Sequence, residues 1–264
     1  MSTLAKDLVE LDAPKDGVRV YWQGHAGVSV KGPEGQILHV DPYLSNSLAH
    51  LGPEFERKQP ITISPEELVG DVVMCTHDHE DHLNPETVGP LSKAHPDLTF
   101  VTPSGCVPIM QAAGVDEARI VPLDVGERIE LAGATITGVY TDHELFYVDG
   151  QFMIHGSAGY LIDLAGVSVL NLGDTGYTIQ HHEIMNPDVL AAPINGLYHL
   201  TSADDIALLS RAIQPRVIFP VHYGVCEMYE TDPNDLRQAL EAHGVETDLR
   251  VLEPGDSFEY RSAH

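Results

Sequence analysis

Short apolar runs alternate with turn residues along this chain, and the spacing of the runs changes with position. The first third holds brief β-rich runs separated by glycine-containing turns, at Val18–Trp22, Gly27–Lys31 and Gln36–Val40. From Asp71 onward, strand-like runs are followed by helical stretches, and a second β-rich block begins at Arg128. Short strand runs bounded by turn residues and strand runs followed by helices thus succeed one another along the chain.

These patterns predict an α/β fold in which two sheets pack together with helices outside, a four-layer αββα sandwich. No linker or low-complexity segment interrupts residues 1–264, so we expect one domain. Residues 44–65 are expected to form an irregular loop. Helices are expected at Pro85–Ala94, Gly105–Ala113, Ser202–Ile213 and Asn234–His243. Further strands are expected at Val72–Cys75, Leu98–Val101, Ile120–Pro122, Arg128–Leu131, Ala134–Tyr140, Gly159–Leu164, Val167–Leu172 and Val217–Val221, and near Leu249 and Phe258.

A cluster of potential metal ligands directly follows the apolar run that ends at Cys75. Its sequence is Thr76-His77-Asp78-His79-Glu80-Asp81-His82. In an extended chain, side chains repeat with a period of two, so His77, His79 and Asp81 would point the same way and His82 elsewhere. One turn could thus serve two metal ions. Several imidazoles with a carboxylate favour zinc, with manganese or iron as alternatives.

Three later motifs complete a recognisable pattern. Asp174 lies in Asn171–Gly176 after an apolar strand, and His222 lies in Phe219–Gly224. His143 follows the expected strand 134–140. Together with the His-rich cluster, these motifs resemble the metallo-β-lactamase-fold hydrolases over nearly the whole chain.

The resemblance implies a dinuclear metal site with two divalent ions. His77, His79 and His143 would hold the first ion, and Asp81, His82 and His222 the second, while Asp174 bridges both. A hydroxide between the ions would be the nucleophile, and Asp81 would also relay a proton to the leaving group. His155 is an alternative to His143 as the remaining ligand.

Further candidates lie near these motifs. His25, in Trp22–Gly27, is expected to line the site or to sit in a turn. Asp41 is expected to orient a ligand imidazole by accepting its distal N–H, or to serve only as a turn residue. His199 precedes an expected helix, and the resemblance to the N-acylphosphatidylethanolamine phospholipase branch makes it a candidate catalytic acid or oxyanion stabiliser.

The resemblance is greatest to the L-ascorbate-6-phosphate lactonase-like branch, in the stretches Gly24–Gly27, Gly173–Thr175, Thr201–Asp204 and Pro220–His222. The chain departs from that branch by lacking an arginine in residues 194–200. It implies hydrolysis of a small lactone or ester. A phosphodiesterase resembling N-acylphosphatidylethanolamine phospholipase and a non-catalytic metal-binding protein remain the alternatives.

Composition narrows the expected partners. The formal net charge of −26 disfavours nucleic acids and anionic membranes, which leaves a small-molecule substrate and a homo-oligomer open. Three scattered cysteines argue against a disulfide framework, and the start at Met1 carries no secretion signal. We therefore expect a cytoplasmic protein.

Overall fold

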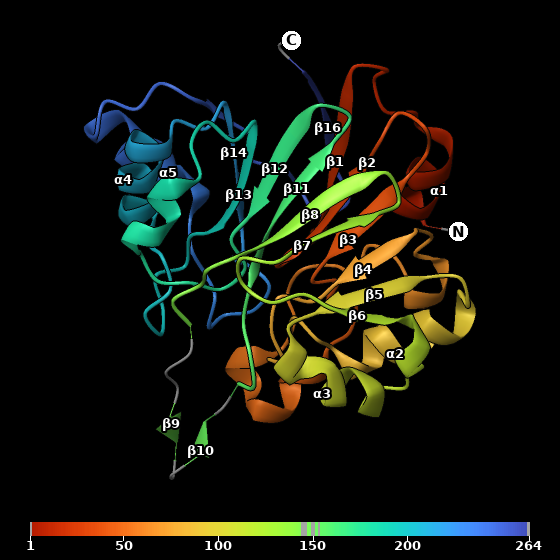
Figure 1. Ribbon diagram of the computed structural model, residues 1–264. Helices are drawn as coiled ribbons and strands as arrows, with labels where there is room; N and C mark the ends of the chain where they lie inside the picture. Colours follow the sequence, from red (N-terminus) through yellow and green to blue (C-terminus); the bar gives the residue numbers. More distant parts are fainter. Residues whose placement is uncertain (1, 144–146, 149–150, 153, 263–264) are drawn as a thin grey trace.

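Two seven-stranded sheets lie face to face in the computed structural model, and helices cover the outer face of each sheet (Figure 1). The structure describes residues 2–143, 147–148, 151–152 and 154–262. The predicted four-layer αββα sandwich is confirmed. A large apolar core fills the space between the sheets because side chains alternate between the two faces of each strand.

The first sheet is antiparallel on one side and parallel on the other. Alternation is clear in its fourth strand, where Val72 and Met74 face the core between the sheets and Val73 packs with the helices outside. In order across the sheet, the strands are β16 (Ser257–Arg261), β1 (Gly17–Gly24), β2 (Gly27–Lys31), β3 (Ile37–Val40), β4 (Val72–Met74), β5 (Thr99–Thr102) and β6 (Ile120–Pro122).

The second sheet is also mixed. In order, the strands are β15 (Asp248–Leu249), β14 (Val217–Val221), β13 (Val189–Pro193), β12 (Val167–Asn171), β11 (Gly159–Leu164), β8 (Ala134–Val139) and β7 (Arg128–Leu131). Its parallel strands β12 and β14 lead to Asp174 and His222, whereas His143 follows the antiparallel β8. A separate pair consists of β9 (Tyr147–Val148) and β10 (Gln151–Phe152).

Helices cover both outer faces. They are α1 (Thr3–Glu10), α2 (Pro85–Ala94) and α3 (Val107–Ala112) against the first sheet, and α4 (Ala203–Ile213) and α5 (Pro233–Ala242) against the second. The boundaries predicted for α2 are confirmed. Helix α4 starts one residue later than predicted because Ser202 is its N-cap: its hydroxyl accepts a hydrogen bond from the Asp205 N–H. The carboxylate of Asp205 in turn accepts one from the Ser202 N–H.

Several elements differ from the prediction. The sequence pattern did not predict α1, which buries Leu4 and Leu8, or β13, whose run Val-Leu-Ala-Ala-Pro holds one β-branched residue and ends in a proline. The helix predicted over 105–113 is shorter, because a 3₁₀ turn occupies its first residues. Short 3₁₀ helices occur at Ser47–Leu51, Pro53–Phe55, Pro65–Glu67, Ser104–Cys106, Glu117–Arg119 and Ile179–Glu183.

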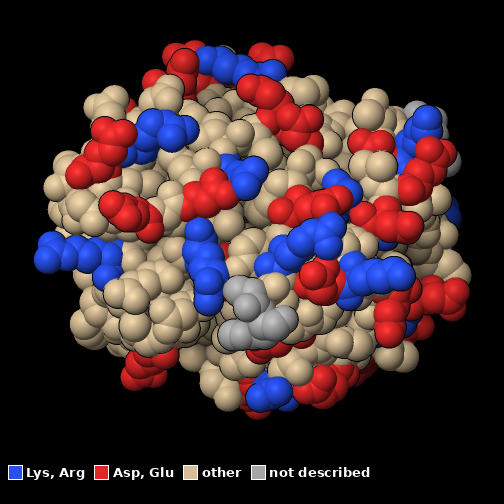
Figure 2. Space-filling view, turned by 90° about the horizontal axis from the view of Figure 1, so that it is seen from above, with Lys and Arg blue, Asp and Glu red and all other residues tan. Residues whose placement is uncertain are grey.

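Two surface observations bear on partners. Within the described ranges, no helix is both long and apolar enough to cross a membrane. On the face seen from above, lysine and arginine side chains are interspersed with aspartate and glutamate (Figure 2).

Candidate metal centre

Loops that follow strands of both sheets bring the candidate ligands together. Strand β4 leads into the loop 76–82, while β12 and β14 lead to Asp174 and His222. His25 lies in the tight turn between β1 and β2. Eight imidazole and carboxylate side chains form two clusters, and the potential ligand atoms within each cluster all lie within 4.8 Å of one another.

The first cluster contains His77, His79, His143 and Asp174. Nε2 of His77 lies 2.9 Å from Nδ1 of His79, and Nε2 of His143 lies 3.2 Å from the same atom. Neutral imidazoles at these distances direct lone pairs toward one another unless a proton or a cation lies between them. Three imidazole nitrogens that converge in this way form a donor set suited to a metal ion.

The second cluster contains His25, Asp81, His82 and His222. Nε2 of His222 lies 3.2 Å from Nε2 of His82 and 3.6 Å from Oδ2 of Asp81. That carboxylate oxygen also lies 2.8 Å from Nε2 of His25. His25 is therefore a buried member of the cluster and not merely a turn residue.

Asp174 lies between the two clusters. Its Oδ1 is 3.5 Å from Nε2 of His82 and 3.3 Å from Nε2 of His222, whereas its Oδ2 faces His143 at 3.9 Å. Oδ1 is buried and forms no hydrogen bond with the described residues. Because a buried carboxylate oxygen without a hydrogen bond is costly, this atom favours a bound cation. The imidazole and carboxylate ligands of the two clusters thus fit two divalent ions such as zinc, and the side chain of Asp174 faces both clusters.

The His-rich loop is not extended throughout, which corrects one premise of the sequence argument. The N–H groups of His82 and Leu83 both donate to the carbonyl of His79, at 3.0 and 2.9 Å, and so form a turn. Asp81 consequently lies in the second cluster instead of on the same side as His77 and His79. The loop serves both clusters, although by a turn and not by strand alternation.

The structure distinguishes His143 from its alternative, His155. His143 is buried in the first cluster. The side chain of His155 is 61% exposed, and its Nδ1 lies 2.6 Å from Oδ2 of Asp78. His155 thus lies outside both clusters and holds its segment to the His-rich loop.

Asp41 lies behind the second cluster. Its buried carboxylate accepts hydrogen bonds from the N–H and the hydroxyl of Thr76, both at 2.7 Å, and lies 2.8 Å from Nδ1 of His82. A carboxylate at this position holds the proton on Nδ1 and leaves Nε2 of His82 free to bind a metal. The structure thus places Asp41 where the sequence argument expected an orienting acid.

Three site residues have left-handed backbone conformations at the ends of strands. The φ angles are 51° for His25, 47° for Asp41 and 58° for His222. Such angles are unfavourable for residues with a β-carbon and persist where surrounding contacts fix them. For His25, its carbonyl accepts hydrogen bonds from the His222 N–H at 3.0 Å and from Nε1 of Trp22 at 2.9 Å.

Burial and charge set different protonation states in the two clusters. Burial lowers the pKa of His143 to about 4 and that of His25 to about 3. Burial also lowers the pKa of His222, but the carboxylates of Asp174 and Asp81 outweigh this effect and raise it to about 9. Without a metal, His222 therefore carries a proton at neutral pH, while His143 is neutral.

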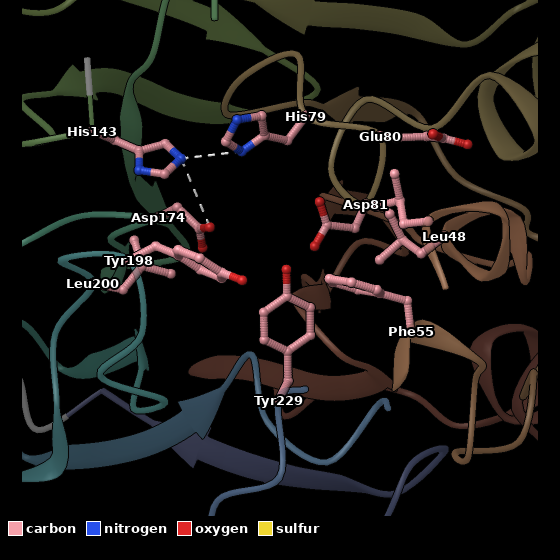
Figure 3. A pocket seen from close by; sticks show the side chains of 11 residues that line it. Leu48, Phe55, His79, Glu80, Asp81, His143, Asp174, Tyr198, Leu200 and Tyr229 are labelled. Atoms are coloured by element: carbon pink, nitrogen blue, oxygen red, sulfur yellow. Dashed lines mark hydrogen bonds and ion pairs between the residues drawn. The ribbon is translucent and has the colours of Figure 1, made fainter. Parts of the chain in front are cut away.

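A cavity of about 320 Å³ opens onto both clusters (Figure 3). Its volume suits a small molecule. Apolar and aromatic side chains form most of its wall, and none of its described lining residues is lysine or arginine. The lining residues are Leu48, Leu51, Phe55, His79, Glu80, Asp81, His143, Asp174, Tyr198, Leu200 and Tyr229.

His199, the second residue predicted to be catalytic, does not line this cavity. Its side chain is exposed, whereas its neighbours Tyr198 and Leu200 are lining residues. Both Tyr198 and His199 have positive φ angles, 49° and 69°, so the backbone turns sharply there. The catalytic role of His199 stays a prediction that this position does not favour.

Two residues near the site have no place in the sequence argument. The Asn195 amide lies against His222, with its Nδ2 2.6 Å from Nδ1 of the ring. Tyr229 lines the cavity from the loop after β14. Neither has a motif of its own, and the only signal was proximity in sequence to motif residues.

Comparisons with known proteins agree with this architecture. Residues 19–222 match the family model described as a beta-lactamase superfamily domain. The UPF0173 metal-dependent hydrolase MK1542 of Methanopyrus kandleri is 30% identical over 247 residues, which cover 92% of this chain and 100% of that protein.

Solved structures share the fold. Igni18, a metallo hydrolase from Ignicoccus hospitalis, has a TM-score of 0.73 at 23% identity and covers 92% of this chain and 99% of its own. An isothiocyanate hydrolase from Delia radicum gut bacteria has a TM-score of 0.74 at 17% identity, with the same coverage. The family match and the two clusters lead to one conclusion: the chain belongs to the UPF0173 metal-dependent hydrolases of the metallo-β-lactamase superfamily.

Proposed function

We propose that this metal-dependent hydrolase opens a small lactone or cleaves a small ester that is uncharged and carries an apolar group. The observation that carries this proposal is the composition of the cavity wall. Leu48, Phe55 and Leu200 offer an apolar wall beside the two clusters, and Glu80 adds a carboxylate. An anionic substrate would find no lysine or arginine among the described lining residues to offset its charge.

The same observation argues against the phosphodiesterase alternative. A phosphodiester is an anion, and enzymes that bind phosphate groups commonly supply arginine or lysine to them. It also argues against a sugar phosphate, in line with the absence of arginine from residues 194–200. A non-catalytic role is disfavoured because all seven predicted ligands lie in the two clusters beside the cavity.

The proposed metal-binding residues are those of the sequence argument. His77, His79 and His143 would hold one ion, and Asp81, His82 and His222 the other, with Asp174 shared. We favour zinc, with manganese or iron as alternatives. When bound, two such ions would supply Lewis acidity and promote the ionisation of water near neutral pH.

The side chains around the cavity would transfer the proton and exclude water. Asp81 lines the cavity and accepts from His25, so its carboxylate is held in one orientation beside the substrate. From there it can take a proton from the attacking water and return it to the leaving alkoxide. Leu48, Phe55 and Leu200 exclude bulk water from the reacting groups, which strengthens every electrostatic interaction inside.

A substrate screen with defined metals tests this proposal. The metal-free protein would be loaded with Zn²⁺, Mn²⁺ or Fe²⁺ and assayed on γ-nonalactone, 4-nitrophenyl butyrate, phenethyl isothiocyanate and bis(4-nitrophenyl) phosphate. The isothiocyanate is included because a protein of similar fold hydrolyses that class. We expect the neutral lactone or ester to be hydrolysed fastest. Turnover of the phosphodiester alone would overturn the proposed substrate class.

A further inference from the structure

Tyr229 occupies a fixed position in the cavity wall. Its ring packs edge-on against His222, with centroids 4.9 Å apart, and against Phe55 at 6.4 Å. It also lies 5.6 Å from the ring of His25, at a tilt of 31°. The backbone is held as well, because the carbonyl of Tyr229 accepts a hydrogen bond from the Gly224 N–H at 2.7 Å. These contacts fix where its hydroxyl points.

The Tyr229 hydroxyl points into the cavity beside Asp81 and Asp174 (Figure 3). In the part of the chain that the structure describes, no group forms a hydrogen bond with it. Tyr198 also presents its hydroxyl to this space, but that hydroxyl donates to Sδ of Met228 at 3.7 Å. The two tyrosines therefore differ in how fully their hydroxyls are engaged.

We propose that the Tyr229 hydroxyl donates a hydrogen bond to the substrate oxygen on which negative charge develops during hydrolysis. This inference rests on the proposed function of the site. A phenol O–H is a neutral donor, and a donor held in advance at the place where charge develops lowers the barrier without reorganisation. It would thus supply, from the apolar side of the cavity, a polar contact that the sequence argument had sought from His199.

The step balances without any other reactant. The oxygen of water forms a bond to the acyl carbon, and the π electron pair of the carbonyl moves to the carbonyl oxygen, where Tyr229 donates its hydrogen bond. The water proton passes to the carboxylate of Asp81. When the carbonyl re-forms, the bond to the alkoxide breaks and the alkoxide takes the proton from Asp81. Tyr229 keeps its own proton throughout.

The substitution Tyr229→Phe tests this role, because it removes the hydroxyl and keeps the ring that packs against His222. We expect kcat for the neutral ester to fall by about 10- to 100-fold, the value of one hydrogen bond to a charged group. The KM should change by less than about threefold, because the contact forms mainly in the transition state. Metal content, measured by elemental analysis, should not change. The matched control is Tyr177→Phe, because Tyr177 is exposed, is not a lining residue of the cavity and has its hydroxyl 2.9 Å from Nε2 of His182. This variant should retain most of the activity.

A second readout does not depend on turnover. An alkyl boronic acid forms a tetrahedral anion, and calorimetry would compare its binding to the metal-loaded wild type and to Tyr229→Phe. We expect about tenfold weaker binding by the variant. An unchanged kcat, or a loss of metal in parallel with kcat, would overturn the inference while leaving the proposed function intact. If the wild type hydrolyses none of the substrates, the proposed function fails, and equal boronic acid binding would separately overturn the role of Tyr229.

Discussion

Asp41 lies 2.8 Å from Nδ1 of His82 and so determines which nitrogen of that imidazole faces the second cluster. The same carboxylate accepts two hydrogen bonds from Thr76, the residue that opens the His-rich loop. One buried acid at the end of β3 therefore orients the imidazole of His82 and fixes the start of the loop that carries three other proposed ligands. This relationship joins the first sheet directly to the site.

Replacing Asp41 by asparagine should weaken metal binding. An amide cannot hold the proton on Nδ1 of His82 as a carboxylate does, so the ring loses its preferred tautomer. We expect about 10- to 100-fold lower affinity for the more weakly bound ion, measured by competition with a chromogenic chelator. Asp71→Asn is a suitable control, because Asp71 accepts a hydrogen bond from the Ile37 N–H at the other end of β3. Equal affinity losses in both variants would contradict an orienting role.

His143 and His155 give opposite predictions. His143→Ala removes a buried member of the first cluster, so elemental analysis should find about one metal ion fewer per chain, with loss of activity. His155→Ala removes an exposed side chain whose partner is Asp78, so metal content should not change. If His155→Ala lost the metal and His143→Ala retained it, the assignment drawn from the structure would be wrong.

Metal binding at the second cluster should depend on pH. His222, with its pKa raised to about 9, must release a proton when an ion binds. Burial lowers the pKa of His82, but the carboxylates of Asp174, Asp41 and Asp81 outweigh this effect and raise it well above its ordinary value, so this ring must also release a proton. The apparent affinity should therefore rise by at least about tenfold per pH unit from pH 7 toward 9. His143 has a pKa lowered to about 4 and is already neutral, so binding at the first cluster should change little over this range.

In the metal-free protein, folding stability changes with pH in the direction opposite to metal affinity. The raised pKa of His222 means that its stabilising contribution is full below its ordinary value of 6.5 and is lost as the pH rises toward 9. Chelator competition at pH 6.5, 7.5 and 8.5, together with thermal unfolding of the metal-free protein, measures both effects. Identical pH slopes for the two ions would count against this assignment.

His199→Ala tests the catalytic residue suggested by family resemblance. Because the side chain is exposed and does not line the cavity, we expect kcat and KM within about twofold of the wild type, the small effect typical of surface substitutions. Steady-state kinetics on the substrate found by the screen would measure this. A large loss of kcat with unchanged metal content would instead support the original prediction and would imply movement of the 198–200 turn.

The sequence by itself indicated the fold class and six of the seven candidate ligands, because these depend on local signals. Strands and helices are encoded by apolar periodicity, and the His-rich cluster, Asp174 and His222 each directly follow a strand. Asp41 was recognisable for the same reason. Strand β13 was not, because its burial on both faces allows an alanine-rich run that carries no strand pattern of its own.

Only the tertiary structure decided which side chains come together at the site and which residues form the cavity wall. Either His143 or His155 could have approached His79. The outcome depends on how β8 and the His-rich loop meet across the two sheets, and no local sequence pattern indicates this. The turn that sends Asp81 into the second cluster depends on backbone hydrogen bonds. The cavity wall is formed by segments from distant parts of the chain, so the role proposed for Tyr229 could be inferred only after packing had brought its ring against His222.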